Sequence, residues 1–276
     1  MKTYNRLRAV IDLDAVMYNM QMMYRNIKND ARMIVVVKTD GYGHGAVPIA
    51  EMLEDVEYVW GYAVATLEEG ILLRKAGIGK PILCLGCIFP DQMEAMIRHQ
   101  IRMTVYDGEL AALASAKAEE LGMNAIFHIK IDTGMSRLGF APDDVSVNAI
   151  EKISHLPCVE LEGMFTHFSR ADEKNKEITD QQFTSYIRVK EELEKRGIHF
   201  SLLHVSNSAA IIDQPELNLN LVRAGISTYG MYPSEEVRKD SVPLKPAMEL
   251  ISHITYLKKN EKGTAVSYGG TFVADR

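Results

Sequence analysis

Short apolar runs recur at regular intervals along most of the chain, and this recurrence limits the fold more than any other feature. Eight such runs alternate with longer stretches that have the apolar spacing of amphipathic helices. Several runs are apolar at every position, which is typical of strands buried on both faces of a parallel sheet. The runs are Met33–Val37, Tyr58–Val64, Ile82–Leu85, Met103–Val105, Ala125–Ile131, Val159–Phe165, Phe200–Val205 and Leu219–Val222.

The stretches between the runs predict the helices that connect parallel strands. Helix signals are clearest over Asp107–Leu121 and over Thr179–Arg196, where Gly197 follows as a stop signal. Eight strand–helix repeats within 276 residues predict an α/β fold, a (β/α)8 barrel of the TIM type. A doubly wound sheet is the alternative that the pattern alone leaves open.

Two segments outside the eightfold pattern predict a second, mainly β domain. Arg8–Leu13 alternates as a strand does, and after Pro243 two further β-like runs follow, Leu250–Leu257 and Thr264–Tyr268. We therefore expect a barrel over residues 14–240 and a partial β domain from residues 1–13 plus 241–276. Because the sequence stops soon after a strand-like run, which would leave strand edges unpaired, we expect this second domain to be incomplete.

The composition limits the kinds of binding partner and the cellular location that we expect. A formal net charge of -6 disfavours nucleic acid as a partner, because phosphate binding needs a basic surface. No apolar run is long enough to span a bilayer and the first residues do not resemble a signal peptide, which favours a cytoplasmic location. Cys84 and Cys87 form a C-x-x-C pair in an apolar run, but no second pair completes a zinc site. We interpret them as structural and expect no metal.

Functional groups of a (β/α)8 barrel gather at the carboxyl ends of its strands. Lys38 follows the first run directly, where partial burial would lower the pKa of its amine and favour Schiff-base chemistry. The last two strands, where barrels commonly bind phosphate, lead to Ser208, Gly225 and Ile226. Together these groups indicate an anionic, carbonyl-bearing cofactor. The fifth run itself carries Lys130, and the other polar groups that follow runs are Arg137, His167, Asn207 and Arg223.

Four long motifs stand at these strand ends. They are Val36-Val37-Lys38-Thr39-Asp40-Gly41-Tyr42-Gly43-His44-Gly45, Lys130-Ile131-Asp132-Thr133-Gly134-Met135-Ser136-Arg137-Leu138-Gly139, His204-Val205-Ser206-Asn207-Ser208-Ala209-Ala210 and Val222-Arg223-Ala224-Gly225-Ile226. In this order they resemble the signatures of the alanine racemase family, and the similarity extends from Ile11 to Gly270. Thr39 stands where the family often has alanine, and Ser136 where it often has glycine.

The resemblance implies pyridoxal 5'-phosphate (PLP) as cofactor and two catalytic residues. Lys38 would hold PLP covalently and serve as one acid/base group. Tyr268 would be the second group, on the opposite face of the substrate Cα, because racemisation removes a proton from one face and returns it to the other. A tyrosine has an ordinary pKa of about 10, so a neighbour must favour its phenolate. The resemblance suggests that His167, linked to Arg223, contributes.

The resemblance also assigns binding roles. Arg223 would face the pyridine nitrogen of PLP, and Arg137 would approach the cofactor and the substrate carboxylate. Lys130 would hold Arg137, and in many family members this lysine is carbamylated. The remaining cofactor-binding residues would be Tyr42, Asn207, Ser208, Gly225 and Ile226. All of these except Asn207 would hold the phosphate.

The implied activity is the interconversion of L- and D-alanine for cell-wall precursors, in a homodimer with shared active sites. Two alternatives stay open at this point. One is a racemase that prefers serine or accepts a broader set of amino acids. The other is a non-catalytic PLP-binding barrel protein, which would need neither Tyr268 nor the arginine-bearing loop 132–139.

Overall fold

The computed structural model describes residues 6–28 and 30–276, and these residues divide into two compact units. The larger unit is Ile11–Ala247, and the smaller one combines the described residues before Ile11 with Met248–Arg276. The expected domains, residues 14–240 and residues 1–13 plus 241–276, stay a prediction, because compactness alone does not define a domain.

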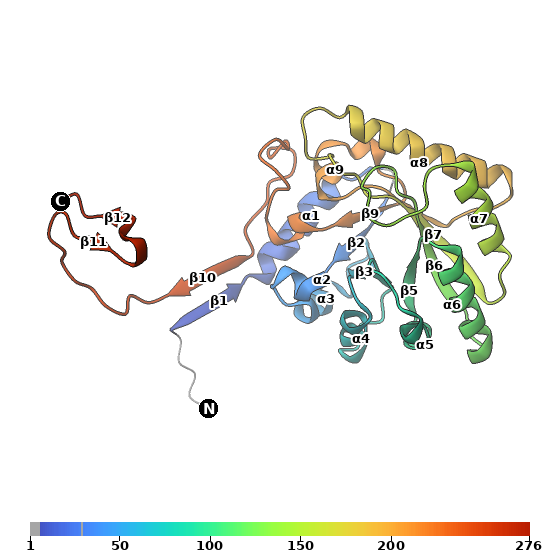
Figure 1. The fold of residues 1–276 in the computed structure, drawn as a ribbon, viewed down its shortest axis with the longest axis horizontal. Coiled ribbons are helices and arrows are strands. Elements are labelled where there is room, and N and C mark those ends of the chain that lie inside the picture. Colours follow the sequence, from blue (N-terminus) through green and yellow to red (C-terminus); the bar gives the residue numbers. More distant parts are fainter. Residues whose placement is uncertain (1–5, 29) are drawn as a thin grey trace. The chain divides into compact units, whose positions relative to one another are not determined.

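Eight parallel strands form the centre of the larger unit (Figure 1). Each strand pairs with the next one along the chain from β2 to β8, and β9 returns to pair with β2. This return excludes a doubly wound sheet and confirms the (β/α)8 barrel. The strands are β2 (Arg32–Val36), β3 (Val59–Val64), β4 (Ile82–Cys84), β5 (Ile101–Val105), β6 (Ala125–Lys130), β7 (Val159–Phe165), β8 (Leu202–His204) and β9 (Leu221–Ala224).

The barrel closes between β8 and β9 without a regular strand ladder. One backbone bond joins the two sides, from Arg223 N to Ser206 O at 3.0 Å. The side chain of Asn220 supplies two more, because its Nδ2 donates to Ser201 O at 2.7 Å and its Oδ1 accepts from Leu203 N at 2.7 Å. A side-chain amide carries the same donor and acceptor as a peptide group. The side chain of Asn220 therefore replaces a pair of backbone hydrogen bonds between β8 and β9.

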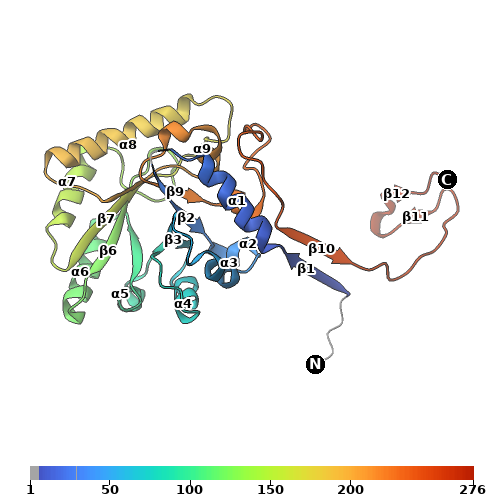
Figure 2. The ribbon, with the colours of Figure 1, turned by 180° about the vertical axis from the view of Figure 1, so that it is seen from behind.

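Helices cover the outside of the barrel (Figures 1 and 2). Asp12 accepts a hydrogen bond from Ala15 N at 3.0 Å, so it caps the first helix, which begins at Leu13. The expectation that a strand extends to Leu13 was wrong for this reason. The helices are α1 (Leu13–Asn26), α2 (Lys38–Tyr42), α3 (Ala46–Leu53), α4 (Leu67–Lys75), α5 (Met93–Arg98), α6 (Gly108–Leu121), α7 (Asp144–Ser154), α8 (Glu177–Lys195) and α9 (Ser208–Asp213), with 3-10 turns at Pro90–Gln92, Pro215–Leu217 and Ile226–Tyr229.

The barrel interior is divided between apolar and polar side chains. One buried cluster, separate from the main core, consists of Ile34, Val36, Trp60, Ala63, Leu83, Leu202 and Leu221. Beside it the Trp60 and His128 rings lie 5.8 Å apart, and His128 belongs to a hydrogen-bonded group of polar residues. That group consists of Arg102, His128, Glu162, His204 and Arg223. Charge is therefore buried at the centre of the fold and must be paired there.

Two small sheets form the smaller unit. β1 (Leu7–Ile11) pairs with β10 (Met248–Ser252), and β11 (Ala265–Val266) pairs antiparallel with β12 (Phe272–Val273). The expected strand Leu250–Leu257 was wrong in its extent, since β10 ends at Ser252, where its five-residue partner β1 offers no further pairing. The strand expected over Thr264–Tyr268 was also wrong in its extent, because β11 ends at Val266 and a 3-10 turn follows at Tyr268–Gly270.

Three further observations concern the described residues as a whole. No helix among them has the length and apolar character needed to cross a membrane. No group of three or more histidine, cysteine, aspartate or glutamate side chains in residues 6–28 and 30–276 could hold a metal ion. Cys84 is buried in β4, whereas Cys87 lies exposed in the next loop, and all three cysteines are free thiols.

Candidate active site

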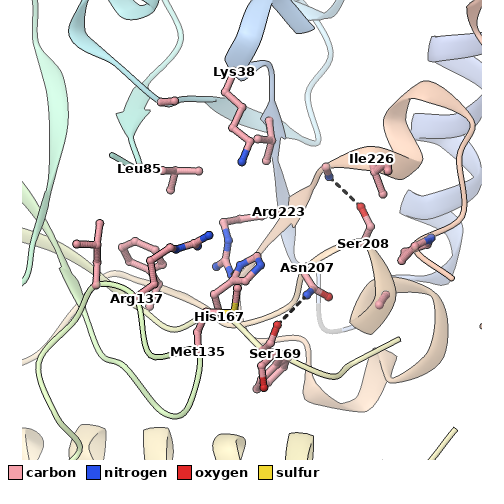
Figure 3. A pocket seen from close by; sticks show the side chains of 18 of the residues that line it. Lys38, Leu85, Met135, Arg137, His167, Ser169, Asn207, Ser208, Arg223 and Ile226 are labelled. Carbon is pink, nitrogen blue, oxygen red and sulfur yellow. Dashed lines mark hydrogen bonds between the residues drawn. The ribbon is translucent and has the colours of Figure 1, made fainter. Parts of the chain in front are cut away.

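A cavity of about 570 Å³ opens where the carboxyl ends of the barrel strands meet (Figure 3). All the site residues that the sequence predicts within the barrel line it. Tyr268 belongs to the smaller unit, where its side chain is fully exposed, and its catalytic role stays a prediction. The predicted residues that line the cavity are Lys38, Tyr42, Lys130, Arg137, His167, Asn207, Ser208, Arg223, Gly225 and Ile226.

Lys38 begins a turn that winds in the left-handed sense. Thr39, Asp40 and Tyr42 each have φ 53°, and Gly41 between them has φ 60°. Left-handed backbone is unfavourable for residues with a Cβ, at roughly 1–2 kcal/mol each, so the surroundings must hold this turn in place. The side chain of Lys38 is thereby directed into the cavity (Figure 3).

Two carboxylates hold the left-handed turn. Glu69 of α4 accepts from Thr39 N at 2.7 Å through Oε1 and from Ala65 N at 2.7 Å through Oε2. Asp40 accepts from Ala46 N at 2.8 Å and so fixes the start of α3. Glu69 therefore ties the loops after β2 and β3 together, beside the lysine that the first loop carries.

Burial lowers the pKa of the Lys38 amine, as the sequence predicted. Arg137 lowers it further by charge repulsion, and Glu69 opposes both effects. An amine with a lowered pKa is more often neutral at physiological pH. Lys38 is therefore a stronger candidate nucleophile and base than an exposed lysine.

Arg137 reaches the cavity from a loop that Asp132 organises. Asp132 Oδ1 accepts from the backbone N–H groups of residues 134, 135 and 136 at 3.0, 2.9 and 3.0 Å, and Oδ2 accepts from Arg137 N at 3.0 Å. Although burial opposes ionisation, these bonds lower the pKa of the Asp132 carboxyl. A single carboxylate thus shapes the loop that presents Arg137.

Lys130 is buried below the same loop. Its Nζ donates to Ile131 O at 2.7 Å and to Leu138 O at 3.1 Å, so it holds the two ends of the loop together. These two bonds reach the backbone at both ends of the loop that carries Arg137, and the role of Lys130 in holding Arg137 stays a prediction. Burial, aided by repulsion from Arg223 and Arg137, lowers the pKa of Lys130 to about 8.

Ser208, Gly225 and Tyr42 lie close together in the wall of the cavity. Ser208 Oγ accepts from Gly225 N at 3.0 Å. A Cβ placed on Gly225 would lie 3.5 Å from Ser208 Oγ and 3.8 Å from the Tyr42 hydroxyl oxygen. Ile226 opens a 3-10 turn whose first N–H groups lack partners within the turn. These groups surround a cradle that suits an anion such as phosphate.

Arg223 is buried at the base of the cavity and is 3% exposed. Nη1 donates to His204 Nδ1 at 2.8 Å, and Nη2 lies 3.3 Å from His167 Nδ1. Nη2 also donates to Thr166 O at 2.7 Å and to Val205 O at 3.0 Å. Because burial and Arg223 lower the pKa of His167 well below its ordinary value, this histidine is neutral.

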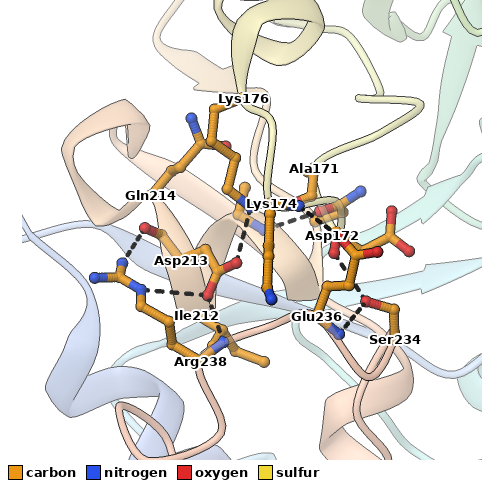
Figure 4. Close-up of polar contacts among 12 residues, drawn as sticks. Ala171, Asp172, Lys174, Lys176, Ile212, Asp213, Gln214, Ser234, Glu236 and Arg238 are labelled. Atoms are coloured by element: carbon orange, nitrogen blue, oxygen red, sulfur yellow. Dashed lines mark hydrogen bonds and ion pairs between the residues drawn. The ribbon is translucent and has the colours of Figure 1, made fainter.

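The rim of the cavity is fixed by a polar network around α9 (Figure 4). The buried Asp213 carboxylate accepts from Lys176 Nζ at 2.8 Å and from Arg238 N at 2.9 Å. Ser234 Oγ donates to the carbonyl oxygen of Asp172, a residue that lines the cavity, at 2.8 Å. The segment after the barrel is thereby held against the loop after β7.

Sequence reasoning missed several residues that shape this site. Asp132 and Glu69 act through backbone N–H groups, which no motif reveals. His128 and His204 received no role from the sequence, although His204 bonds directly to Arg223. Glu162 left one visible signal, a charged residue within the β7 run Val159–Phe165.

Comparison with known proteins places this architecture. The family described as "Alanine racemase, N-terminal domain" matches residues 11–233. Alanine racemase of Clostridium tetani is 45% identical over 268 residues, which cover 97% of this chain and 69% of the relative. The solved structure of alanine racemase from Clostridium difficile 630 superposes with a TM-score of 0.92 at 43% identity, covering 99% of this chain and 71% of that one.

A more distant neighbour is histidine racemase from Leuconostoc mesenteroides, at 26% identity and a TM-score of 0.85, covering 99% of this chain and 72% of that one. The fold of this chain is therefore shared with solved structures of racemases. With the family match spanning most of the barrel and 45% identity to a curated relative, the chain belongs to the alanine racemase family.

Proposed function

We propose that this chain is a PLP-dependent enzyme that interconverts L- and D-alanine. The observation that carries the proposal is that Lys38, Arg137 and Arg223 line one cavity in a chain of this family. When bound, PLP withdraws electrons from the substrate Cα and makes its proton easier to remove. The protein's own residues hold the cofactor, position the substrate and exchange the proton.

The cavity fits PLP in two respects. The cradle between Ser208, Tyr42 and Gly225 is open where a side chain on Gly225 would fill it, and it supports binding of the phosphate. Lys38 supplies an amine with a lowered pKa for the covalent link. Asn207, Ile226 and His167 complete the proposed cofactor site.

Two groups exchange the proton in this proposal. Lys38 removes or returns it at Nζ on one face, and Tyr268 does so at its hydroxyl oxygen on the other. His167 supports the tyrosine because it is neutral and accepts from Arg223 at Nδ1, which leaves an N–H at Nε2 to stabilise a phenolate. We further propose a homodimer with shared active sites, as the family resemblance implies.

The two arginines have different roles. Arg223 would face the ring nitrogen of the cofactor, where its positive charge would disfavour a proton on that nitrogen and limit side reactions. Arg137 binds the substrate carboxylate, for which a planar guanidinium is well suited. The D-alanine formed would serve cell-wall precursors, and we expect the activity in the cytoplasm.

Serine or a broader set of amino acids is the alternative substrate. The neighbour that is a histidine racemase indicates that this architecture accommodates side chains larger than methyl. A non-catalytic PLP carrier is disfavoured by the family match and by the arginine-bearing loop 132–139.

The test follows exchange of the α-proton in deuterated water by NMR, with L-alanine, D-alanine and L-serine offered separately to the PLP-loaded chain. Tyr268→Phe should retain bound PLP and lose exchange, most strongly from one enantiomer. Lys38→Ala should lose the covalent cofactor. Tyr256→Phe is the matched control, because Tyr256 is an exposed tyrosine of the same unit with no proposed role.

Exchange with inversion of both alanine enantiomers would support the proposal. Faster exchange with L-serine than with either alanine would replace it with the broader racemase. Bound PLP with no exchange of any amino acid, and Tyr268→Phe indistinguishable from the parent chain, would favour a carrier.

A further inference from the structure

A continuous line of hydrogen bonds leads from the base of the cavity into the barrel interior. Arg223 begins it and lines the cavity, whereas the next three residues are not among the cavity lining. We call this line the histidine relay. It consists of Arg223, His204, His128 and Glu162, supplied by β9, β8, β6 and β7 in turn.

The relay is short at every step and almost wholly buried. Arg223 Nη1 lies 2.8 Å from His204 Nδ1, and His204 Nε2 lies 2.8 Å from His128 Nδ1. His128 Nε2 lies 2.8 Å from Glu162 Oε2. Both histidines are 0% exposed, so the bond between them is shielded from water, whereas the Glu162 side chain is 13% exposed.

The two ends of the relay determine where its protons lie. A guanidinium only donates, and an ionised carboxylate only accepts. Arg223 therefore requires an unprotonated Nδ1 on His204, whose proton is then on Nε2 and is donated to His128. His128 must in turn carry its proton on Nε2, where Glu162 accepts it. Every ring nitrogen has one partner of the correct kind, which explains how two buried imidazoles remain satisfied.

The charges around the relay agree with this assignment. Burial lowers the pKa of both histidines, and Arg223 opposes a further positive charge on each of them, joined by Arg102 at His128. Lys130 adds to this repulsion at His204. Burial opposes ionisation of Glu162, but hydrogen bonds from His128 and Arg102 outweigh it and lower the pKa of Glu162 to about 2.

Neighbouring rings leave the relay little freedom to reorganise. Phe165 stacks on His204 with ring centroids 4.6 Å apart and an angle of 9°. On the far side, Arg102 Nε donates to Glu162 Oε2 at 3.1 Å and fixes the carboxylate. A change of proton position at one step therefore has to be met at the next step by another proton shift, not by side-chain movement.

We propose that Glu162 is a positioning residue for the active site: as the terminal acceptor of the histidine relay, it fixes the protons on His128 and His204 and thereby the guanidinium of Arg223. Without an acceptor at the far end, the buried His128 Nε2–H has no partner. If that proton moved to His128 Nδ1, it would face the proton on His204 Nε2 and the hydrogen bond between the two rings would be lost. His204 would then have to protonate Nδ1, directly against Arg223.

Two variants separate positioning from mere structural support. Glu162→Gln keeps an oxygen that accepts from His128 Nε2–H. In the parent chain Arg102 Nη2 donates to Glu162 Oε1 at 3.2 Å, and the glutamine would place a second donor, its amide nitrogen, at that position. Glu162→Leu removes the acceptor altogether. Both variants lose stability, and only Glu162→Leu breaks the relay. Glu54→Gln is the matched control, since Glu54 accepts from Gly79 N and Tyr62 and has no bond to the relay.

The readout is the tautomer of each histidine, measured by two-bond ¹H–¹⁵N NMR on the ¹⁵N-histidine-labelled chain, first without PLP. His128→Gln and His204→Gln assign the two signals. In the parent chain, Glu162→Gln and Glu54→Gln, we expect both rings to be neutral with the proton on Nε2. In Glu162→Leu we expect His204 to leave this state, by changing tautomer or by broadening.

Two results would overturn the proposal. One is a parent chain in which either ring is charged or protonated on Nδ1. The other is a folded Glu162→Leu in which the His204 signals are those of the parent. If Glu162→Leu does not fold, Glu162→Met at reduced temperature makes the same comparison.

The kinetic consequence rests on the proposed function, but the NMR result does not. In the PLP-loaded chain, Glu162→Leu should lower kcat for alanine at least tenfold with little change in KM, and Glu162→Gln should restore most of it. An intact relay in a chain without racemase activity would contradict the proposed function alone. Racemase activity with no tautomer change in Glu162→Leu would contradict the relay alone.

Discussion

Asp132→Asn should release the loop that presents Arg137, even though it changes a single atom type. The asparagine oxygen can replace Oδ1 and keep the bonds from the N–H groups of residues 134–136. Its amide nitrogen then takes the place of Oδ2 and points a donor at Arg137 N–H, which now donates to that oxygen at 3.0 Å. One bond is lost and the other three lose the assistance of charge.

The expected magnitude follows from these bonds. A hydrogen bond to a charged group contributes about 1.5–3 kcal/mol, and the weakening of the other three brings the total loss to ~3 kcal/mol. Since each 1.4 kcal/mol corresponds to about a factor of ten, the open form of the loop should become about a hundred times more populated. The fold itself should remain, because Lys130 still joins residues 131 and 138.

Trypsin provides the assay, because it cleaves after Arg137 only when the loop opens, and the rate then follows the population of the open form. The cleavage site is identified by mass spectrometry. Asp107→Asn is the control: Asp107 caps α6 with one oxygen, Oδ1, which accepts from residues 109 and 110 and is kept in asparagine. Equal cleavage after Arg137 in Asp132→Asn and the parent chain would refute the reasoning.

Three further predictions concern the barrel. Burial lowers the pKa of His128, His167 and His204, so below the ordinary histidine pKa the unfolded chain binds protons that the folded chain does not bind. The stability is therefore complete above pH ~6.5 and falls by up to ~4 kcal/mol per pH unit below it, and urea denaturation that is independent of pH from 8 to 5 would contradict this. Asn220→Ala should cost ~1 kcal/mol and accelerate hydrogen exchange at Leu203 N, whereas unchanged exchange there would mean that the Asn220 bonds do not close the barrel. Lys130, with a pKa of about 8, should react with CO2 in bicarbonate, so native mass spectrometry should find one added CO2 in the parent chain and none in Lys130→Met; equal masses gained by both would place the modification elsewhere.

The barrel could be predicted because its signal is repeated and local. The clearest strand runs, such as Met33–Val37, are buried on both faces and therefore apolar throughout, and together with the more mixed runs they showed all the strands of the barrel. The ends of the elements were less visible. Asp12 starts a helix where an alternating pattern suggested that a strand continues, because one cap decides the backbone there. The extent of β10 depends on its partner β1, which lies far away in the sequence.

The site residues were predictable where the chemistry itself needs a particular side chain. Lys38 lies just after β2, Arg137 lies in the loop after β6 and Arg223 lies near the end of β9, so the barrel geometry brings them to one cavity. The relay was not predictable in this way. His128 and Glu162 are 34 residues apart, and His128 and His204 are 76 apart, so nothing local connects them. Asp132 and Glu69 were missed because they bind backbone groups, which carry no sequence signal.

The left-handed turn after Lys38 has a consequence for when the active site forms. Thr39, Asp40 and Tyr42 together store ~3–6 kcal/mol of unfavourable backbone energy, which a short isolated segment cannot offset. The compensating bond to Thr39 comes from Glu69, and the strand before it is held by Tyr229, whose hydroxyl donates to Val36 O at 2.7 Å. Although Lys38 leaves the ribosome early, the turn therefore has to wait for residue 229. We expect a half-made chain to carry an ordinary protonated lysine, so that the reactive amine is assembled last and free aldehydes do not modify the protein during its synthesis.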